Sequence, residues 1–360
     1  QEILDEIPEV DGILGTTTYD EISNVLSQVL GGQEHVQCFH DLNALPKAGT
    51  ERMITTGGHY AFLKIAEGCD KRCTYCIIPS LRGSYRSVPM EELVAQAENL
   101  AQKGVKELIL VAQETTVYGV DLYGKKSLPE LLRRLCKIEG IQWIRIQYCY
   151  PEEITDELIQ VIGQEEKICH YLDLPIQHAS DRILKRMGRR TSQEQLRAII
   201  EKLRKEIPDI ALRTTLISGF PGETEEDHEA LLSFVDEMEF ERLGVFAYSA
   251  EEDTPAASFP DQIPQEVKEE RRDEIMELQQ EISFDHSQSM VGQVLEVMIE
   301  GKVADENAYV GRTYMDGPGV DGLIFVQTGE ALMSGDFARV RVTGAMEYDL
   351  IGELENESAQ

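Results

Sequence analysis

Three cysteines lie close together in the segment GCDKRCTYCIIP. Cys69, Cys73 and Cys76 are separated by gaps of three residues and then two. Thiolates are the usual ligands of iron–sulfur clusters and also bind zinc. Three thiolates can hold three irons of a cubane cluster and leave the fourth iron open to a substrate or cofactor. A structural zinc site is the alternative, with His59 or His40 as its fourth ligand.

Six apolar, β-rich segments alternate with helical patterns between about residues 60 and 290. Near-continuous apolar runs are typical of parallel strands that are buried on both faces. Six strand–helix repeats are too few for a closed eight-stranded barrel, so we expect an α/β fold with an open, partial (β/α)6 barrel. Such folds carry their chemistry at the carboxyl ends of the strands, where the cysteine segment lies. The expected strands are residues 61–66, 107–113, 143–149, 170–177, 210–220 and 242–249.

Helix signals punctuate these repeats. Pro89 suits the first turn of a helix. Thr191 and Glu194 have the spacing of a capping box. Thr224 precedes a run of acids that suits the amino end of a helix dipole. A charged helix is expected over about residues 264–288.

Short alternating strands over residues 291–350 predict a small antiparallel β-barrel. This part holds ten acids and four bases, a net charge of −6. We assign residues 1–55 to the remnant of an N-terminal domain and a linker, 56–289 to the partial barrel and 290–357 to the small barrel. Because the first residue is not methionine, we expect the chain to begin inside a longer protein.

Composition narrows the functional classes. Acids outnumber bases by 66 to 34, which gives a net charge of −32 at pH 7. Such a field disfavours nucleic acid phosphates and favours basic partners, although it can also serve solubility alone. No segment approaches the ~18 uncharged apolar residues of a membrane span. The seven cysteines form a poor disulfide framework and are typical of a reducing cytoplasm.

The cysteine segment resembles the radical S-adenosylmethionine (SAM) superfamily, whose members carry this spacing with an aromatic residue, here Tyr75, before the third cysteine. Within the superfamily, ALRTTLISGFPGET (211–224), LPIQHASDRILKRMGRR (174–190) and VAQETTVYG (111–119) resemble the methylthiotransferases. The segment GRTYMDGPGVDGLIFV (311–326) resembles the branch that modifies an aspartate of ribosomal protein S-twelve.

This resemblance implies a 4Fe–4S cluster on the three cysteines, with SAM bound to the open iron through its amino and carboxylate groups. An electron from an external donor then splits SAM to methionine and a 5′-deoxyadenosyl radical. The family has three domains: an N-terminal domain with a second cluster, the radical barrel and a C-terminal TRAM barrel. The three cysteines of the second cluster are absent from this chain.

Several residues match positions where relatives bind SAM. Glu114 would compensate the SAM ammonium, and the glycine-containing turn after the fifth strand would lie beside adenine. Arg213 and Gln177 would each face the SAM carboxylate or pair within the barrel. The SAM-contacting set is Tyr75, Gln113, Glu114, Gln177, Arg213, Gly219 and Glu223, and no further catalytic residue is assigned.

We therefore expect a cytoplasmic radical SAM methylthiotransferase that acts on the β-carbon of an aspartate in ribosomal protein S-twelve, not directly on nucleic acid. Its acidic C-terminal barrel would dock this basic protein, with Asp305, Asp316 and Asp321 as contacts. One alternative is a tRNA adenosine methylthiotransferase. The other is a zinc-stabilised, non-catalytic module that binds the ribosome.

Overall fold

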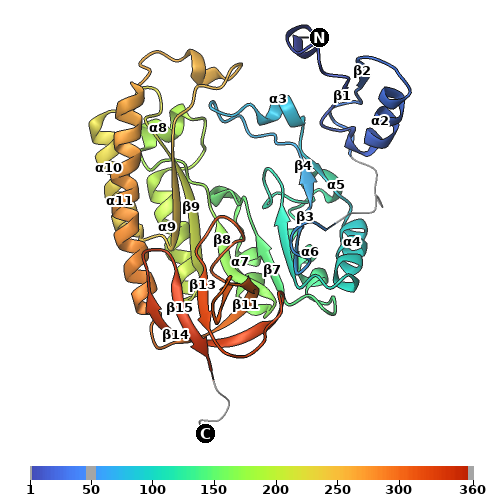
Figure 1. The fold of residues 1–360 in the computed structure, drawn as a ribbon. Helices are drawn as coiled ribbons and strands as arrows, with labels where there is room; N and C mark the ends of the chain where they lie inside the picture. Colours follow the sequence, from blue (N-terminus) through green and yellow to red (C-terminus); the bar gives the residue numbers. More distant parts are fainter. Residues whose placement is uncertain (1, 46–53, 356–360) are drawn as a thin grey trace.

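The computed structural model describes residues 2–45 and 54–355, which form an N-terminal unit, a central α/β sheet and a C-terminal barrel (Figure 1). Part of the expected linker, residues 46–53, lies outside the described residues, as do residues 356–357 at the expected end of the small barrel. Among the described helices, none combines the length and the apolar character that crossing a bilayer requires.

Six parallel strands form the central sheet, in the spatial order β10-β9-β8-β7-β6-β3. The two outermost strands do not pair with each other, so the barrel is open and partial as the sequence predicts. The strands are β3 (Tyr60–Lys64), β6 (Glu107–Val111), β7 (Trp143–Ile146), β8 (Ile168–Asp173), β9 (Ala211–Ser218) and β10 (Arg242–Ala247).

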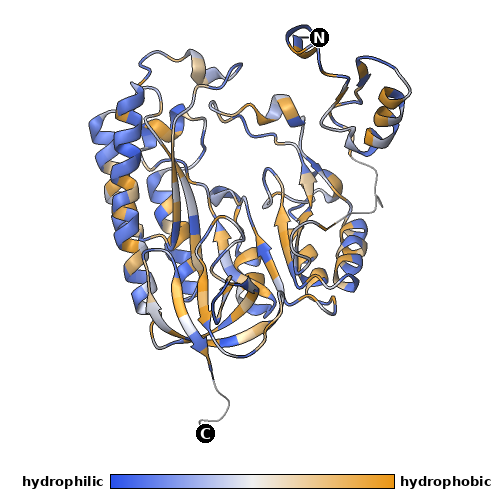
Figure 2. Ribbon diagram, in the orientation of Figure 1, coloured by the Kyte–Doolittle hydropathy of each residue, from blue (hydrophilic) through white to orange (hydrophobic). Residues whose placement is uncertain are grey.

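Helices cover the outer face of this sheet, and one continuous apolar core fills the space between the two layers. The central strands are largely hydrophobic, whereas the outer surfaces of α10 and α11 are hydrophilic (Figure 2). The longer helices are α4 (Met90–Gln102), α6 (Leu128–Leu135), α7 (Asp156–Gln164), α9 (Gln193–Glu206), α10 (Glu225–Met238) and α11 (Gln265–Ser289). Shorter elements are β4 (Ala66–Glu67), α3 (Ile78–Arg82), β5 (Arg86–Ser87), α5 (Val120–Tyr123), α8 (Asp181–Arg186) and the 3-10 turns η2 (Pro151–Glu153) and η3 (Pro255–Ser258).

Two of the three helix starts lie one residue away from the position predicted from the sequence. Pro89 is the N-cap of α4 and lies just outside its first turn. The capping box of α9 is formed by Ser192 and Gln195, one residue later than the predicted pair, because Ser192 has the extended backbone that an N-cap requires. Thr224 begins α10 as expected, and Asp227 completes its capping box.

The C-terminal barrel is closed, in the order β11-β12-β13-β15-β14. Its pairs are antiparallel except for β13 and β15, which run parallel. It packs beneath the amino ends of the central strands, where the rings of Trp143 and Phe337 meet edge to face with centroids 4.9 Å apart. The strands are β11 (Val294–Lys302), β12 (Ala308–Arg312), β13 (Ile324–Gln327), β14 (Phe337–Ala345) and β15 (Leu350–Leu354).

The N-terminal unit is a small parallel β-α-β arrangement beside α3 (Figure 1). Its contact with the central part includes the Thr16 hydroxyl, which donates to the Leu81 carbonyl oxygen at 3.1 Å. Leu26, Leu30 and Phe39 are exposed on it. The elements are α1 (Glu2–Glu6), β1 (Gly12–Leu14), η1 (Tyr19–Glu21), α2 (Ile22–Leu30) and β2 (Val36–Cys38).

A buried ion network joins the central sheet to the C-terminal barrel. The fully buried Glu107 accepts hydrogen bonds from Arg145 Nε at 2.7 Å and from Arg312 Nη2 at 2.6 Å. Arg312 also donates to Glu300 at 2.6 Å, and Glu300 contacts His59 Nε2 at 2.9 Å. Burial alone would raise the pKa of Glu107, but the two guanidinium groups outweigh burial and hold the pKa below its usual range.

Two acids expected to contact a basic partner belong instead to this interface. Asp316 is buried and pairs with Arg242 at 2.6 Å. The side chain of Asp321 is 2% exposed and pairs with Arg213 at 3.2 Å. Their assignment as docking contacts was wrong, because both side chains turn inward to neutralise arginines of the central sheet. Asp305 is exposed.

We predict that Arg312→Met lowers the free energy of unfolding by about 3–5 kcal/mol, because it removes one partner from a buried charge pair and leaves Glu107 undercompensated. Urea unfolding at neutral pH measures this change. Arg339→Met is the control: Arg339 pairs with Glu355 on the surface, where such a pair is worth less than about 1 kcal/mol. Equal losses of unfolding free energy in the two variants would contradict the larger contribution that we assign to the buried network.

Candidate active site at the carboxyl edge of the sheet

The cysteine loop follows β3 and β4 at the carboxyl edge of the sheet. Gly68 opens it with a φ of +81°, and a side chain there would collide with the Ser84 carbonyl oxygen. Backbone hydrogen bonds then hold the loop: Thr74 N–H donates to the Met187 oxygen at 2.9 Å, and Cys76 N–H to the Cys73 oxygen at 3.1 Å. The loop is therefore fixed by contacts that reach from β3 to the segment after α8.

A cavity of about 700 Å³ adjoins this loop. Its volume lies within the roughly 300–1,000 Å³ typical of cofactor sites. Three of the residues predicted from the sequence line it, namely Cys69, Cys73 and Glu114. Tyr150 and Arg189, which the sequence reading did not single out, line it as well.

The thiols of the loop are shielded from solvent. Burial raises the pKa of Cys69 to about 11 and raises that of Cys76 as well. A metal centre bound to these sulfurs would hold them as thiolates, since metal binding displaces the thiol proton. This soft donor set beside a cavity fits an iron–sulfur cluster.

The geometry gives the zinc alternative no support. In the described ranges, no three His, Cys, Asp or Glu side chains converge where one metal ion could be held. His59 precedes β3, at the opposite end of the strand from the cysteine loop, and its Nε2 contacts Glu300 at 2.9 Å.

Glu114 is a buried carboxylate with a free oxygen in the same cavity. Glu114 is 1% exposed, and its Oε1 accepts hydrogen bonds from the backbone N–H and the hydroxyl of Thr116. Oε2 has no partner among the described residues. Burial raises the pKa of Glu114 to about 7 although the Thr116 hydrogen bonds oppose this shift. The site therefore suits a cationic ligand group, which would pair with the free oxygen. The adjacent Gln113 also has an unpartnered side-chain oxygen.

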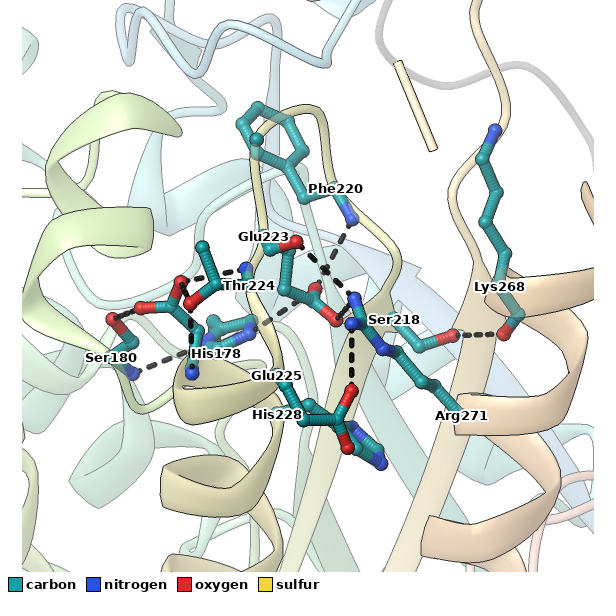
Figure 3. A network of polar contacts seen from close by, with 12 residues as sticks. His178, Ser180, Ser218, Phe220, Glu223, Thr224, Glu225, His228, Lys268 and Arg271 are labelled. Atoms are coloured by element: carbon teal, nitrogen blue, oxygen red, sulfur yellow. Dashed lines mark hydrogen bonds and ion pairs between the residues drawn. The ribbon is translucent and has the colours of Figure 1, made fainter. Parts of the chain in front are cut away.

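The turn after β9 is held by a polar network that reaches α11 (Figure 3). Gly219 has a φ of +67°, and a side chain there would collide with Lys268. Glu223 Oε2 accepts from the Phe220 N–H at 3.2 Å, and Oε1 accepts from Arg271 Nη1 at 2.9 Å. Both oxygens are partnered and the residue is 4% exposed, so Glu223 positions the turn, and its contact with SAM stays a prediction.

His178 completes this network from the segment that follows β8. Its Nδ1 accepts hydrogen bonds from the N–H groups of Ala179 at 3.0 Å and Ser180 at 2.9 Å, so the ring proton is on Nε2. Nε2 lies 3.4 Å from Glu223. His178 therefore supports the turn through Glu223.

Two basic residues of α11 have roles that the sequence reading missed. Arg271 pairs with Glu223 (Figure 3), and Lys268 Nζ donates to the Tyr248 carbonyl oxygen at 3.0 Å. The sequence held no apolar signal for them, although the structure buries Lys268, Arg271, Ile275 and Gln279 at helical spacing along α11. This stripe marks the two basic residues as part of the inward face of α11.

Tyr75 and Gln177 also belong to the predicted SAM-contacting set. Tyr75 meets Phe220 edge to face, with centroids 6.4 Å apart, so it bridges the cysteine loop and the turn after β9. Gln177 has a φ of +72° and extends the pairing of β8 with β9 through its backbone, which accepts from Ile217 N–H at 2.8 Å. Both lie on the carboxyl side of the sheet.

Arg213 is the third residue of β9 and lies near the amino end of that strand. Its Nη1 donates to Asp173 at 3.0 Å and its Nε to Asp321 at 3.2 Å. Arg213 therefore pairs within the barrel interior, the second of the two roles considered, and its contact with SAM stays a prediction.

We predict that Glu114→Gln stabilises the ligand-free chain at pH 8 by about 3 kcal/mol, taking 1.36 kcal/mol per pKa unit, and has little effect at pH 5. The carboxyl keeps its proton up to about pH 7 in the folded chain but releases it near pH 4.5 when unfolded. Its cost therefore grows as the pH rises between these values and is complete above pH 7.

Urea unfolding at pH 5 and pH 8 tests this prediction. Glu153→Gln is the matched control in the same cavity, where Lys126 and Lys71 outweigh burial and lower the pKa of Glu153. That variant should lose stability at pH 8. A Glu114→Gln protein that gains nothing at pH 8 would show that the buried carboxylate is compensated.

Comparison with known proteins identifies the family. The profile of the radical SAM superfamily matches residues 63–235, and that of the TRAM domain matches residues 291–354. A protein from Lachnoclostridium phytofermentans called "Ribosomal protein uS12 methylthiotransferase RimO" is 67% identical over 99% of this chain and 80% of its own length. Proteins of the same name from Acetivibrio thermocellus and Clostridioides difficile are 50% and 48% identical, each over 100% of this chain and 81% and 80% of their own lengths.

Among solved structures, the radical SAM methyltransferase TsrM from Kitasatospora setae, with cobalamin and an iron–sulfur cluster bound, covers 58% of this chain and 39% of its own, with 17% identity and a TM-score of 0.47. The RimO-named relatives extend over nearly the whole chain at up to 67% identity. The chain therefore belongs to the RimO family of ribosomal protein uS12 methylthiotransferases, within the radical SAM superfamily.

Proposed function

We propose that this chain carries the radical SAM and TRAM parts of an enzyme that transfers a methylthio group to the β-carbon of an aspartate in ribosomal protein uS12. One observation carries the proposal: the buried, unpartnered oxygen of Glu114 shares a cavity with Cys69 and Cys73, in a chain that is 67% identical to a RimO relative. A buried carboxylate oxygen without a partner suits a cationic amino group, and the neighbouring cysteine thiols suit a metal cluster. The site therefore suits a cofactor that places its amino group close to such a cluster.

We assign the cluster ligands to Cys69, Cys73 and Cys76, which lie on one fixed loop. When bound, the 4Fe–4S cluster and SAM supply the one-electron chemistry that removes hydrogen from an unactivated carbon, with the electron coming from an external donor. By resemblance to the family, one SAM supplies the transferred methyl group and a second supplies the radical.

The chain's own residues bind and orient SAM in this proposal. Glu114 accepts hydrogen bonds from the SAM ammonium, which also relieves the cost of its burial. The open backbone of the turn at Gly219 lies beside the adenine, and Tyr75 with Phe220 supplies an aromatic wall. Arg271 and His178 keep that turn in place through Glu223.

Charge supports a basic protein as the substrate. The net charge of −32 disfavours nucleic acid and favours a basic partner. Arg339 and Arg341, two of the exposed bases of the C-terminal barrel, are paired with Glu355 at 2.7 and 2.8 Å. The exposed acids Asp305 and Glu306 remain for docking. We place the protein in the cytoplasm, where its seven cysteines, all free, stay reduced.

We predict that replacing Cys69, Cys73 and Cys76 together by Ala abolishes iron binding after anaerobic reconstitution, because each thiolate holds one iron. Iron and sulfide analysis with the visible absorption spectrum measures it. Cys136→Ala is the control, since Cys136 lies at the end of α6, apart from the cavity, and should keep the full iron content. Iron retained by the triple variant would disprove the ligand assignment.

The substrate assignment has its own test. We predict that this 360-residue chain, reconstituted and reduced with dithionite, cleaves SAM to 5′-deoxyadenosine but does not methylthiolate uS12, because the sequence holds no second set of three clustered cysteines. A longer protein that includes the family's N-terminal cluster domain should form methylthio-aspartate, which mass spectrometry of uS12 detects. Methylthiolation by the 360-residue chain alone would contradict the proposed need for a second cluster, and absence of product from the longer protein would contradict the substrate assignment.

A further inference from the structure

A tyrosine hydroxyl lies against one sulfur of the cysteine loop. Tyr150 follows β7, at the carboxyl edge of the sheet, and its hydroxyl oxygen is 3.3 Å from Cys73 Sγ. A phenol is a donor at neutral pH and a thiolate is an acceptor. The geometry therefore sets a hydrogen bond from Tyr150 to Cys73 whenever Cys73 is deprotonated.

Two cations flank the ring of this tyrosine. The guanidinium carbon of Arg189 lies 4.1 Å from the ring centroid, and Lys71 Nζ lies 4.8 Å from it. Both distances are within the roughly 6 Å over which cations are attracted to an aromatic face. The positive charges draw electron density from the ring and strengthen the hydroxyl as a donor.

Arg189 is a buried cation with incomplete pairing. Its side chain is 1% exposed, and its Nη2 donates to the Pro175 carbonyl oxygen at 3.0 Å. The nearest carboxylate, that of Glu152, is 4.0 Å away, and the Nε and Nη1 groups have no hydrogen-bond partner among the described residues. A buried charge left in this state is costly. The incomplete pairing of Arg189 indicates that a negatively charged group belongs in the cavity that this residue lines.

We propose that Tyr150 and Arg189 are positioning residues that raise the reduction potential of the cluster held by Cys73. This inference rests on the proposed function, since it requires the cluster. Hydrogen bonds to the ligating sulfurs and nearby charge are established controls of cluster potential. A cluster with three thiolates gains one negative charge on reduction, and the Tyr150 hydroxyl and the Arg189 cation stabilise that added charge. The electron comes from the external donor, and no bond forms or breaks in this step.

The alternative role for Tyr150 is packing alone, and Tyr150→Phe separates the two. Phenylalanine keeps the ring and its contact with Arg189 but removes the donor to Cys73. We expect the midpoint potential of the reconstituted 360-residue chain to become more negative. At a fixed poise the ratio of reduced to oxidised cluster should fall by about tenfold, which is about 59 mV for one electron. Potentiometric titration followed by the electron paramagnetic resonance signal of the reduced cluster measures it.

Tyr118→Phe is the matched control. Tyr118 is also buried, and its hydroxyl donates to the Val88 carbonyl oxygen at 2.7 Å, away from the cysteines. Its loss should leave the potential unchanged even if the chain is less stable. A shift of the same size in both variants would overturn the proposal, since a general loosening would then explain it.

Arg189→Met is the second variant and keeps the test decisive if Tyr150→Phe fails to hold a cluster. It should also shift the potential to a more negative value, and Arg189→Lys should restore part of the shift. An unchanged potential in cluster-loaded Tyr150→Phe or Arg189→Met protein would overturn the inference while leaving the proposed function intact. Absence of iron from the unmutated chain would overturn both.

Discussion

The shared carboxylate of Glu107 decides how the two barrels are assembled. It is buried in the central sheet but needs Arg312 of the C-terminal barrel as well as Arg145 of its own neighbouring strand. Separation of the two barrels would leave Glu107 with Arg145 alone and Arg312 with Glu300 alone, so the shared buried network favours the assembled arrangement. The C-terminal barrel is thereby held under the amino ends of the strands. The carboxyl edge, with the cysteine loop, is left free for ligands.

The main features of the fold were predictable because they depend on local pattern. Six apolar runs predicted six strands, and their number predicted an open barrel. Exact helix starts were harder, since the segment T-S-Q-E-Q contains two overlapping capping boxes, Thr191 with Glu194 and Ser192 with Gln195. Both satisfy the sequence rule, and only the backbone conformation of Ser192 selects the second.

The site was predictable where its residues are neighbours in sequence and less so where they are not. The cysteines share one loop, and the structure places Cys69 and Cys73 in one cavity with Glu114. The ion pairs of Arg213 and Glu223 were not predicted because their partners are remote: Asp321 lies 108 residues after Arg213, and Arg271 lies 48 residues after Glu223. Such pairs arise from tertiary packing and leave no local signal. The contact of Tyr150 with Cys73 spans 77 residues and has the same origin.

The unpaired edges of the central sheet set the kind of molecule that can reach its interior. Strands β3 and β10 are both edges, so no strand pairing closes the wall of the barrel between them in the part of the chain that the structure describes. A closed barrel admits only what enters through a mouth, which favours small, free substrates. A wall with a gap also admits a loop from the side while that loop remains attached to a large folded body. Phe246 on β10 is 64% exposed at this border and offers such a loop an apolar contact surface. The missing strands thus make the barrel suited to modifying residues within assembled proteins.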